Sequence, residues 1–178
     1  MSARSESIDV REMTLEDVNI RIDYFHASSD DHLRMLGVDR ALLPTPAQWR
    51  DFYEQDYAKP IEQRVNHSLL WLLEDEVIGF ATTDHVDFGI EAFMHLHITQ
   101  PHLRSDGLGA RFIVRSAAIF FDVLHLKRLL CESNALNAAS NRTVQAAGVR
   151  YLFSHHTQPS PINYPQITTR WILDERPS

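Results

Sequence analysis

Two glycines, Gly107 and Gly109, lie between a strand-like run at 93–98 and a helix-like run at 110–124. A helix N-terminus leaves about four backbone N–H groups unpaired and carries roughly half a positive charge. Glycine tolerates a positive φ and lets the backbone approach a ligand without an intervening Cβ atom. The loop at 104–110 is therefore predicted to bind an anion, and its geometry suits phosphate.

The glycine spacing does not identify the ligand by itself. The dinucleotide fingerprint requires a further glycine three residues after Gly109, where this chain has Phe112. A P-loop requires a Lys followed by Ser or Thr, and no such pair follows. An ordinary tight turn between a strand and a helix stays an open alternative at this point.

The chain of 178 residues has the length of one domain, which we expect to span 1–178 with a core at about 8–173. Its formal charge of −7 argues against a nucleic-acid partner and weakly favours small cationic substrates such as amines. The single cysteine, Cys131, permits no intrachain disulfide. The start of the chain is polar and no apolar run approaches a membrane span, so we expect a cytoplasmic protein without a membrane partner.

The N-terminal third reads as a strand and two helices. A short strand begins near Ile8, and Thr14 is predicted to cap a helix that ends in the region 27–31. Its inward face should carry Leu15, Val18, Ile22 and Phe25, which recur at helical spacing. The segment Thr45-Pro46-Ala47-Gln48 is a capping box that opens a second helix, whose aromatic residues Trp49, Phe52, Tyr53 and Tyr57 are expected in the core.

The middle of the chain reads as strands. The runs 69–73 and 77–83 flank a polar turn and predict an antiparallel hairpin, and 90–98 is the next strand. Within it, Met94, Leu96 and Ile98 should share one face, while Glu91, Phe93, His95 and His97 share the other.

After the helix at 110–124, the run 128–132 is predicted as a strand parallel to the one at 93–98, because a helical crossover joins them. A short helix at 137–147 ends at Gly148, and strands follow at 149–155 and 166–173. The expected fold class is α+β: a mixed, mostly antiparallel central sheet of about seven strands, flanked by about four helices, with one splayed parallel strand pair.

This order of elements, with two motifs, resembles the GNAT acetyltransferase superfamily. The first motif is Arg104-Ser105-Asp106-Gly107-Leu108-Gly109 followed by Ala110. The second lies on the next crossover, where Asn137, Ser140, Gly148 and Val149 have the spacing of the superfamily's second signature. The Ser-Asn-Arg run at 140–142 is more similar to the ribosomal-protein N-acetyltransferase branch (RimJ/RimL-like) than to the spermidine branch. The resemblance covers about 8–173.

The resemblance implies that acetyl-CoA is the cosubstrate and that no metal is needed. The loop would wrap the pyrophosphate with Arg104, Ser105, Asp106, Gly107, Leu108, Gly109 and Ala110. Backbone groups from Leu96 to Ile98 would pair with the pantetheine arm, as would Asn137. One of Arg111, Arg115 and Arg142 would reach the 3′-phosphate, and we select Arg142. The thioester would lie between the strands 93–98 and 128–132, where an amine attacks it directly.

Two residues depart from the superfamily's pattern. Many relatives carry a Tyr seven residues after the Asn as general acid, and this chain has Val144 there. The leaving thiolate must then take its proton elsewhere, from Ser140 through water or from bulk solvent. Asp106 places an acid beside the expected pyrophosphate, where negative charge is unfavourable.

The candidate general bases are Glu91, His95 and His97, which share one face of the strand leading into the loop. Asp84 and His85, at the end of the preceding strand, are a weaker alternative. The other interpretation is that these histidines are structural. Without a cysteine cluster or helical His-x-x-x-His pair, the ten histidines do not predict a metal site.

The sequence thus predicts an acetyl-CoA-dependent N-acetyltransferase that moves an acetyl group to a primary amine. The acceptor would be a small molecule or a protein: an N-terminus, a lysine, or a small polyamine or antibiotic. The alternative is a catalytically degenerate acyl-CoA-binding sensor or scaffold module. Whether the chain forms a homodimer stays open.

Overall fold

The computed structural model describes residues 7–104 and 107–178, which form one seven-stranded sheet and five α-helices. The strands run in the order β1-β2-β3-β4-β5-β7-β6. Their bounds are β1 Ile8–Glu12, β2 His67–Leu73, β3 Glu76–Asp87, β4 Glu91–Ile98, β5 Arg128–Asn134, β6 Arg150–Thr157 and β7 Gln166–Leu173. The helices are α1 Val18–Ala27, α2 Asp30–Leu36, α3 Pro46–Tyr57, α4 Leu108–Val123 and α5 Ala138–Ala146.

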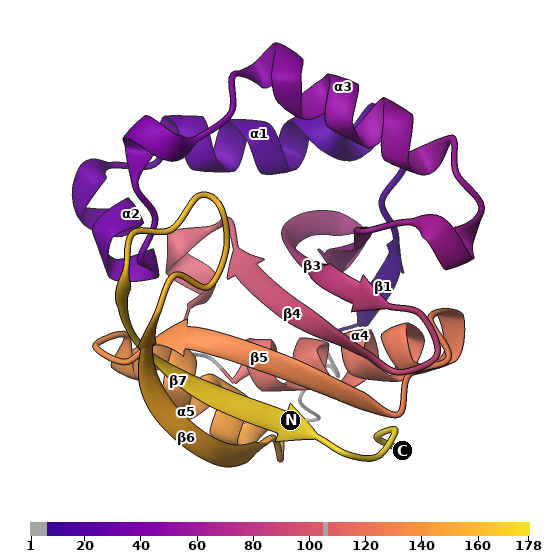
Figure 1. The fold of residues 1–178 in the computed structure, drawn as a ribbon, viewed down its shortest axis with the longest axis vertical. Coiled ribbons are helices and arrows are strands. Elements are labelled where there is room, and N and C mark those ends of the chain that lie inside the picture. Colours follow the sequence, from indigo (N-terminus) through magenta and orange to yellow (C-terminus); the bar gives the residue numbers. More distant parts are fainter. Residues whose placement is uncertain (1–6, 105–106) are drawn as a thin grey trace, which may run out of the picture.

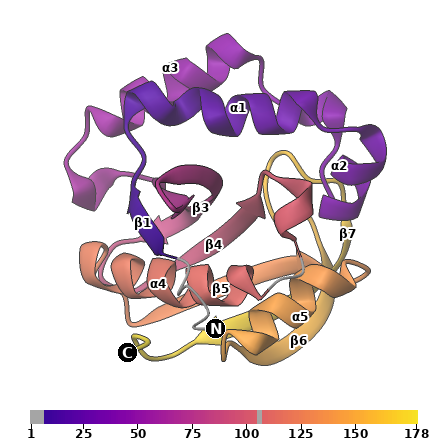
Figure 2. The same ribbon diagram turned by 180° about the vertical axis from the view of Figure 1, so that it is seen from behind.

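The helices pack on both faces of the sheet and produce two cores. On one face, Leu70 and Phe80 pack against apolar residues of α1, α2 and α3. On the other, Trp71 stacks on Phe112 of α4 with ring centroids 4.9 Å apart. Neighbouring residues of β2 serve opposite cores because side chains alternate along a strand. Figures 1 and 2 show α1 and α3 side by side, on the opposite side of the strands from α4 and α5.

The parallel pair β4–β5 is the only parallel pairing among the described strands, and it is short. It runs from Glu91 opposite Arg128 to Met94 opposite Cys131. Beyond Met94, β4 continues beside β3 as far as Ile98, while β5 continues beside β7 as far as Asn134. The two strands therefore diverge, as Figure 1 shows, and the predicted splayed pair is confirmed.

The structure corrects the N-terminal prediction in four places. Thr14 and Asp17 form a capping box on a single 3-10 turn, and the α-helix begins only at Val18. Leu15 on that turn is 46% exposed, so it does not share the buried face of Val18. Phe52 of α3 is also exposed.

The fourth correction is helix α2, which begins at Asp30, inside the predicted break at 27–31, and continues to Leu36, so that the described helices number five. Its local signals are clear in retrospect. Ser29 caps it by accepting from the His32 N–H, acids occupy its first turn, and Gly37 ends it at φ 76°.

Candidate functional site

A cavity of about 460 Å³ opens where β4 leads into α4. Three groups of residues form most of its wall: the last residues of β4, the loop and first turn of α4, and helix α5 with its N-cap. They are Leu96, His97, Ile98, Arg104, Gly107, Gly109, Ala110, Asn137, Ala139, Ser140, Arg142, Thr143 and Ala146. The cavity thus lies at the position predicted for the phosphate-binding loop.

The glycines of this loop have different structural roles. Gly107 caps α4 in the left-handed conformation, with φ 74°, and a Cβ atom there would meet nothing within 4 Å. Its requirement for glycine is therefore conformational. At Gly109 a Cβ atom would lie 2.7 Å from Thr143 Cγ2, so α4 and α5 approach too closely for a side chain. Ser105 and Asp106 lie outside the described residues.

Arginine is the only residue type with a permanent charge on the wall of this cavity, as far as the described residues show. Arg104 donates from Nε and Nη2 to the carbonyl of Ile98, at 3.2 and 2.9 Å, which ties the loop to the end of β4. Arg142 reaches the wall from α5. Arg111 does not line the cavity, and Arg115 bonds the carbonyl of Ile8 instead. No described Asp or Glu contributes to this wall.

Asn137 and Ser140 connect this cavity to a second, deeper one. Asn137 caps α5 by accepting from the Ser140 N–H at 3.1 Å, and the Ser140 hydroxyl lies 3.1 Å from that of Ser133 on β5. Both residues line both cavities. Val144 is fully buried in the core.

The deeper cavity, of about 90 Å³, lies where β4 and β5 diverge. It shares Leu36, Leu96 and His97 with the first cavity, in addition to the α5 residues. Its wall carries two carboxylates, Asp84 and Glu132. Among the described residues, carboxylates therefore occur only in the deeper of the two cavities that meet at the splay, where Arg21 and His95 accompany them.

His95 and Asp84 form an ion pair in the deeper cavity, with His95 Nε2 3.0 Å from Asp84 Oδ1. Burial raises the pKa of the Asp84 carboxyl, but the positive charge of His95 and contacts from both His95 and His85 outweigh it and lower this pKa to about 2. Burial in turn lowers the pKa of His95, and the Asp84 charge overcomes that effect, so it is raised above its ordinary value. The pair thus favours a protonated imidazole beside a carboxylate.

His97 lies between the two cavities in a different environment. Its ring packs against Tyr24, Phe25 and Phe80, each at a centroid distance of 5.1 Å. Its buried Nδ1 has no hydrogen-bond partner among the described residues. Burial, and next the charge of His95, hold the pKa of His97 well below its ordinary value, so the ring is neutral near pH 7.

The structure brings His95 and His97 together but not Glu91, the third candidate base. Glu91 pairs with Arg128 at the start of β4 and lines neither cavity. The alternation of the strand placed all three on one face, but six residues of extended chain separate Glu91 from His97 by roughly 20 Å.

Glu132 was not predicted as a site residue. Only 3% of its side chain is exposed, and its Oε1 accepts from His155 Nε2 at 2.7 Å and Arg170 Nε at 2.6 Å. Cys131 beside it is buried, and burial raises the pKa of its thiol to about 12, which leaves it protonated. Arg21 from α1 also reaches this cavity.

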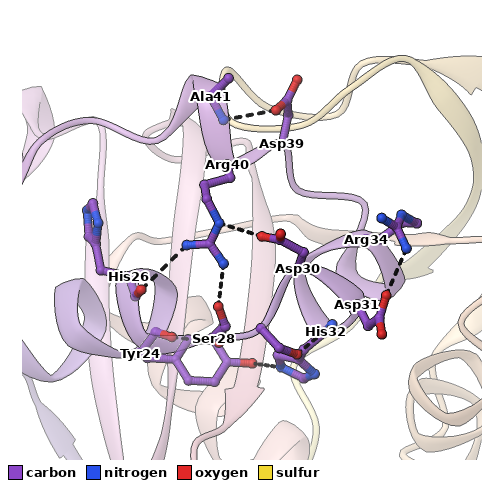
Figure 3. Close-up of polar contacts among 11 residues, drawn as sticks. Tyr24, His26, Ser28, Asp30, Asp31, His32, Arg34, Asp39, Arg40 and Ala41 are labelled. Carbon is purple, nitrogen blue, oxygen red and sulfur yellow. Dashed lines mark hydrogen bonds and ion pairs between the residues drawn. The ribbon is translucent and has the colours of Figure 1, made fainter.

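Tyr24 and His32 complete the wall of the larger cavity from the side of α1 and α2. Figure 3 shows the Tyr24 hydroxyl paired with His32 Nε2, at 2.8 Å. Arg40 fixes this corner by bonding Asp30 on α2 and the carbonyl of Ser28, at 2.6 and 2.5 Å. Burial raises the pKa of Tyr24 to about 12, so its hydroxyl keeps its proton. Because the sequence analysis did not predict α2, it did not predict the contact between Tyr24 and His32 either.

A mixed sheet with one splayed parallel pair, and a glycine-capped helix beginning at the splay, defines the fold of the GNAT acetyltransferases, and this chain has that fold. The ribosomal-protein-S5-alanine acetyltransferase from Vibrio fischeri superimposes with a TM-score of 0.74 at 16% identity, covering 98% of this chain and 96% of that one. Aminoglycoside acetyltransferase AAC(6′)-Ib in complex with coenzyme A gives a TM-score of 0.71 at 16% identity, covering 94% and 95%.

A third similar structure is spermidine N-acetyltransferase from Vibrio cholerae with CoA and spermine, with a TM-score of 0.68 at 14% identity and coverage of 93% and 94%. The sequence itself matches no protein-family model and no curated protein. At these identities the likeness establishes the fold, and the chemistry must be argued from this chain's own residues.

None of the helices in the described part of the chain has the length and apolar character needed to cross a bilayer. Within 7–104 and 107–178, no group of three or more His, Cys, Asp or Glu side chains is arranged to hold a metal ion.

Proposed function

We propose that the protein is an acetyl-CoA-dependent N-acetyltransferase acting on a primary amine. The observation that carries this proposal is the junction at the β4–β5 splay. A large cavity, whose permanently charged side chains among the described residues are Arg104 and Arg142, meets a small one where Asp84 and Glu132 lie beside Arg21 and His95. The first suits an anionic cosubstrate and the second a cationic acceptor.

The residues of the larger cavity fit CoA. The N-terminus of α4 offers unpaired N–H groups at Leu108, Gly109 and Ala110 to a pyrophosphate, next to Arg104. Arg142 is our choice for the 3′-phosphate, while the roles of Ser105 and Asp106 stay predictions. From His95 to Ile98, β4 has no β5 partner, and this edge suits the amides of a pantetheine arm.

Bound acetyl-CoA would supply the thioester carbonyl that the amine attacks. The chain's part begins with the acceptor, because an amine arrives largely as ammonium and must lose a proton. Asp84 and Glu132 line the cavity that would receive the cation, and His95 would accept its proton when the imidazole is neutral. His97, held neutral, offers a hydrogen-bond acceptor at the junction.

Two hydroxyl groups on the larger cavity could protonate the leaving thiolate in place of the missing tyrosine. Ser140 stays the sequence-based candidate, and the structure adds Tyr24, whose pKa of about 12 keeps it a proton donor. Val144 also favours a second proposal, a module that binds acyl-CoA without turnover. We do not assign the acceptor: a protein N-terminus, a lysine and a small polyamine or antibiotic are all primary amines.

Thermal shift and turnover separate these proposals. We expect acetyl-CoA to raise the melting temperature, by mass action, while NAD and ATP do not. An unchanged melting temperature with acetyl-CoA would contradict both the enzyme and the acyl-CoA-binding module. Free CoA released with at least one amine from a panel of polyamines, aminoglycosides and peptides would establish the enzyme, and binding without release would favour the module.

A further inference from the structure

Arg21 of α1 is a partly buried cation without an ion-pair partner among the described residues. Its guanidinium donates one hydrogen bond to them, from Nη1 to the hydroxyl of Tyr53, and its buried Nε has no partner there. The group lies against the rings of Phe25, Trp49 and Tyr53, between 5.3 and 5.9 Å from their centroids. A guanidinium has five N–H donors, so most of its hydrogen-bonding capacity is available to a ligand.

The deeper cavity brings this cation to the diverging strands. Arg21 lines the cavity from α1, together with His95 on β4 and Glu132 on β5. Its positive charge acts on the imidazoles of both His95 and His97. The guanidinium therefore belongs to the wall of the cavity that we propose for the acceptor.

The carboxylates of this cavity have other partners. Asp84 Oδ1 lies 3.0 Å from His95 Nε2, and Glu132 Oε1 lies 2.6 Å from Arg170 Nε. Neither carboxylate is within ion-pair distance of Arg21. A charge withdrawn from water is costly to leave without a counter-charge, so a ligand that brings an anion to Arg21 is favoured here.

Each carboxylate also keeps one oxygen for a ligand. The contacts of Asp84 with its two neighbouring histidines use Oδ1, and those of Glu132 with Arg170 and His155 use Oε1. Asp84 Oδ2 and Glu132 Oε2 accept no hydrogen bond from the described residues. Such oxygens accept from an ammonium group, so the cavity has positions for both a positive and a negative ligand group.

We propose that the acceptor is an α-amino acid and that Arg21 binds its carboxylate. The inference rests on the proposed function, because it names the substrate class of the same site. The ammonium lies at Asp84 and Glu132, and the carboxylate lies at Arg21, whose planar fork matches it. The amine nitrogen bonds to the acetyl carbon as the C–S bond of the thioester breaks. The products are the N-acetyl amino acid, the CoA thiol and one proton released to water.

The charges of the cavity separate this acceptor from the other amines. A polyamine or an aminoglycoside carries several positive charges and would bring them to Arg21 without a counter-charge. At a peptide N-terminus an amide replaces the carboxylate next to the amine. The volume of about 90 Å³ also suits a small acceptor.

The test compares α-amino acids with their carboxamides, which have nearly the same shape but lack the negative charge. Release of free CoA gives kcat/KM for each compound, and calorimetric titration of the CoA-saturated protein measures binding without turnover. Arg21→Gln removes the charge, and Arg21→Lys keeps it without the planar fork. Arg50→Gln is the matched control, because Arg50 links α3 to Asn19 on α1 but lines neither cavity.

We expect the wild-type protein to favour the amino acid over its carboxamide by about 10-fold to 100-fold in both measurements, as a charge-assisted pair would. Arg21→Gln should remove this preference by raising KM for the amino acid, with the carboxamide changed by less than about threefold. Arg21→Lys should keep part of the preference, and Arg50→Gln all of it. Because the preference is a ratio within one variant, a loss of folded protein does not alter it.

Equal use of amino acid and carboxamide by the wild-type protein would overturn the inference, as would better use of a polyamine or a peptide. A preference that survives in Arg21→Gln would remove Arg21 from the site, and should that variant not fold, Arg21→Lys and the wild-type comparison still decide. If no amine releases CoA, the proposed function fails. Calorimetry then decides the inference separately, and an amino acid that does not bind beside CoA would overturn it.

Discussion

Gly107 and Gly89 offer a matched pair of substitutions for testing the anion-binding loop. Both have a positive φ, 74° and 80°, and at both a Cβ atom would meet nothing within 4 Å. Gly107 caps α4 at the larger cavity, while Gly89 lies in the turn before β4, where its N–H bonds the carbonyl of Leu124. A side chain would create similar backbone strain at both positions, but only Gly107 lies at the larger cavity.

Valine at either position should therefore cost similar stability. A left-handed conformation costs a non-glycine residue about 1–2 kcal/mol. For a chain of this size that corresponds to a fall in melting temperature of roughly 2–8 °C. In Gly107→Val, disturbing one or two charge-assisted hydrogen bonds from the first turn of α4 should also weaken CoA binding, by about 10-fold to 100-fold.

Calorimetric titration with CoA measures the affinity, and thermal unfolding measures the stability. We expect equal losses of melting temperature in the two variants and a loss of affinity in Gly107→Val alone. If Gly107→Val binds CoA within threefold of wild type, the loop does not hold the pyrophosphate. If Gly89→Val loses as much affinity, the effect is general destabilisation and the reasoning fails.

Three other variants test single side chains. Asp84→Asn should lose about 2 kcal/mol of stability in urea unfolding. The ionised Asp84, with a pKa of about 2, stabilises the fold above about pH 4, and the protonated His95, with a raised pKa, stabilises it below about pH 6.5. The loss should be largest near pH 4–6 and vanish towards pH 2; a constant loss would contradict the ion pair. Tyr24→Phe should reduce kcat about 100-fold with unchanged CoA affinity, and a kcat within twofold of wild type would exclude Tyr24 as proton donor. Arg104→Gln should weaken CoA binding about 10-fold, whereas Arg111→Gln, away from the cavity, should not.

The sequence contained enough to predict the half of the site that depends on local chain order. The loop at 104–110, the crossover into β5 and the Asn137 cap follow one another in the chain, and each has a short-range signal. The backbone at the start of α4 requires glycine at Gly107, and the start of α5 requires a capping side chain such as that of Asn137. These residue types therefore indicate where the two helices begin. The splay of β4 from β5 followed from the same order.

The smaller cavity, proposed for the acceptor, was harder to predict, because it depends on the register between strands that are distant in the sequence. Asp84 meets His95 only because β3 and β4 pair in one particular register, and Glu132 joins them across the splay. Alternation along β4 gave the correct face for Glu91, but a face does not say which end of the strand meets the cavity. The pairing of Tyr24 with His32 was not predicted for a local reason, the unrecognised helix that carries His32.

The distribution of charge explains how an acidic chain could bind an anionic cosubstrate. A net charge of −7 predicts repulsion of CoA and attraction of an amine. At physiological ionic strength, however, exposed charges are screened beyond about 8 Å, whereas those beside a bound ligand are not. We therefore expect Arg104, Arg142 and the N-terminus of α4 to favour an anion in the larger cavity. The smaller cavity adds the carboxylates of Asp84 and Glu132, beside Arg21 and His95. The net charge conceals this division, which is why composition favoured an amine acceptor while only the loop pointed to its anionic partner.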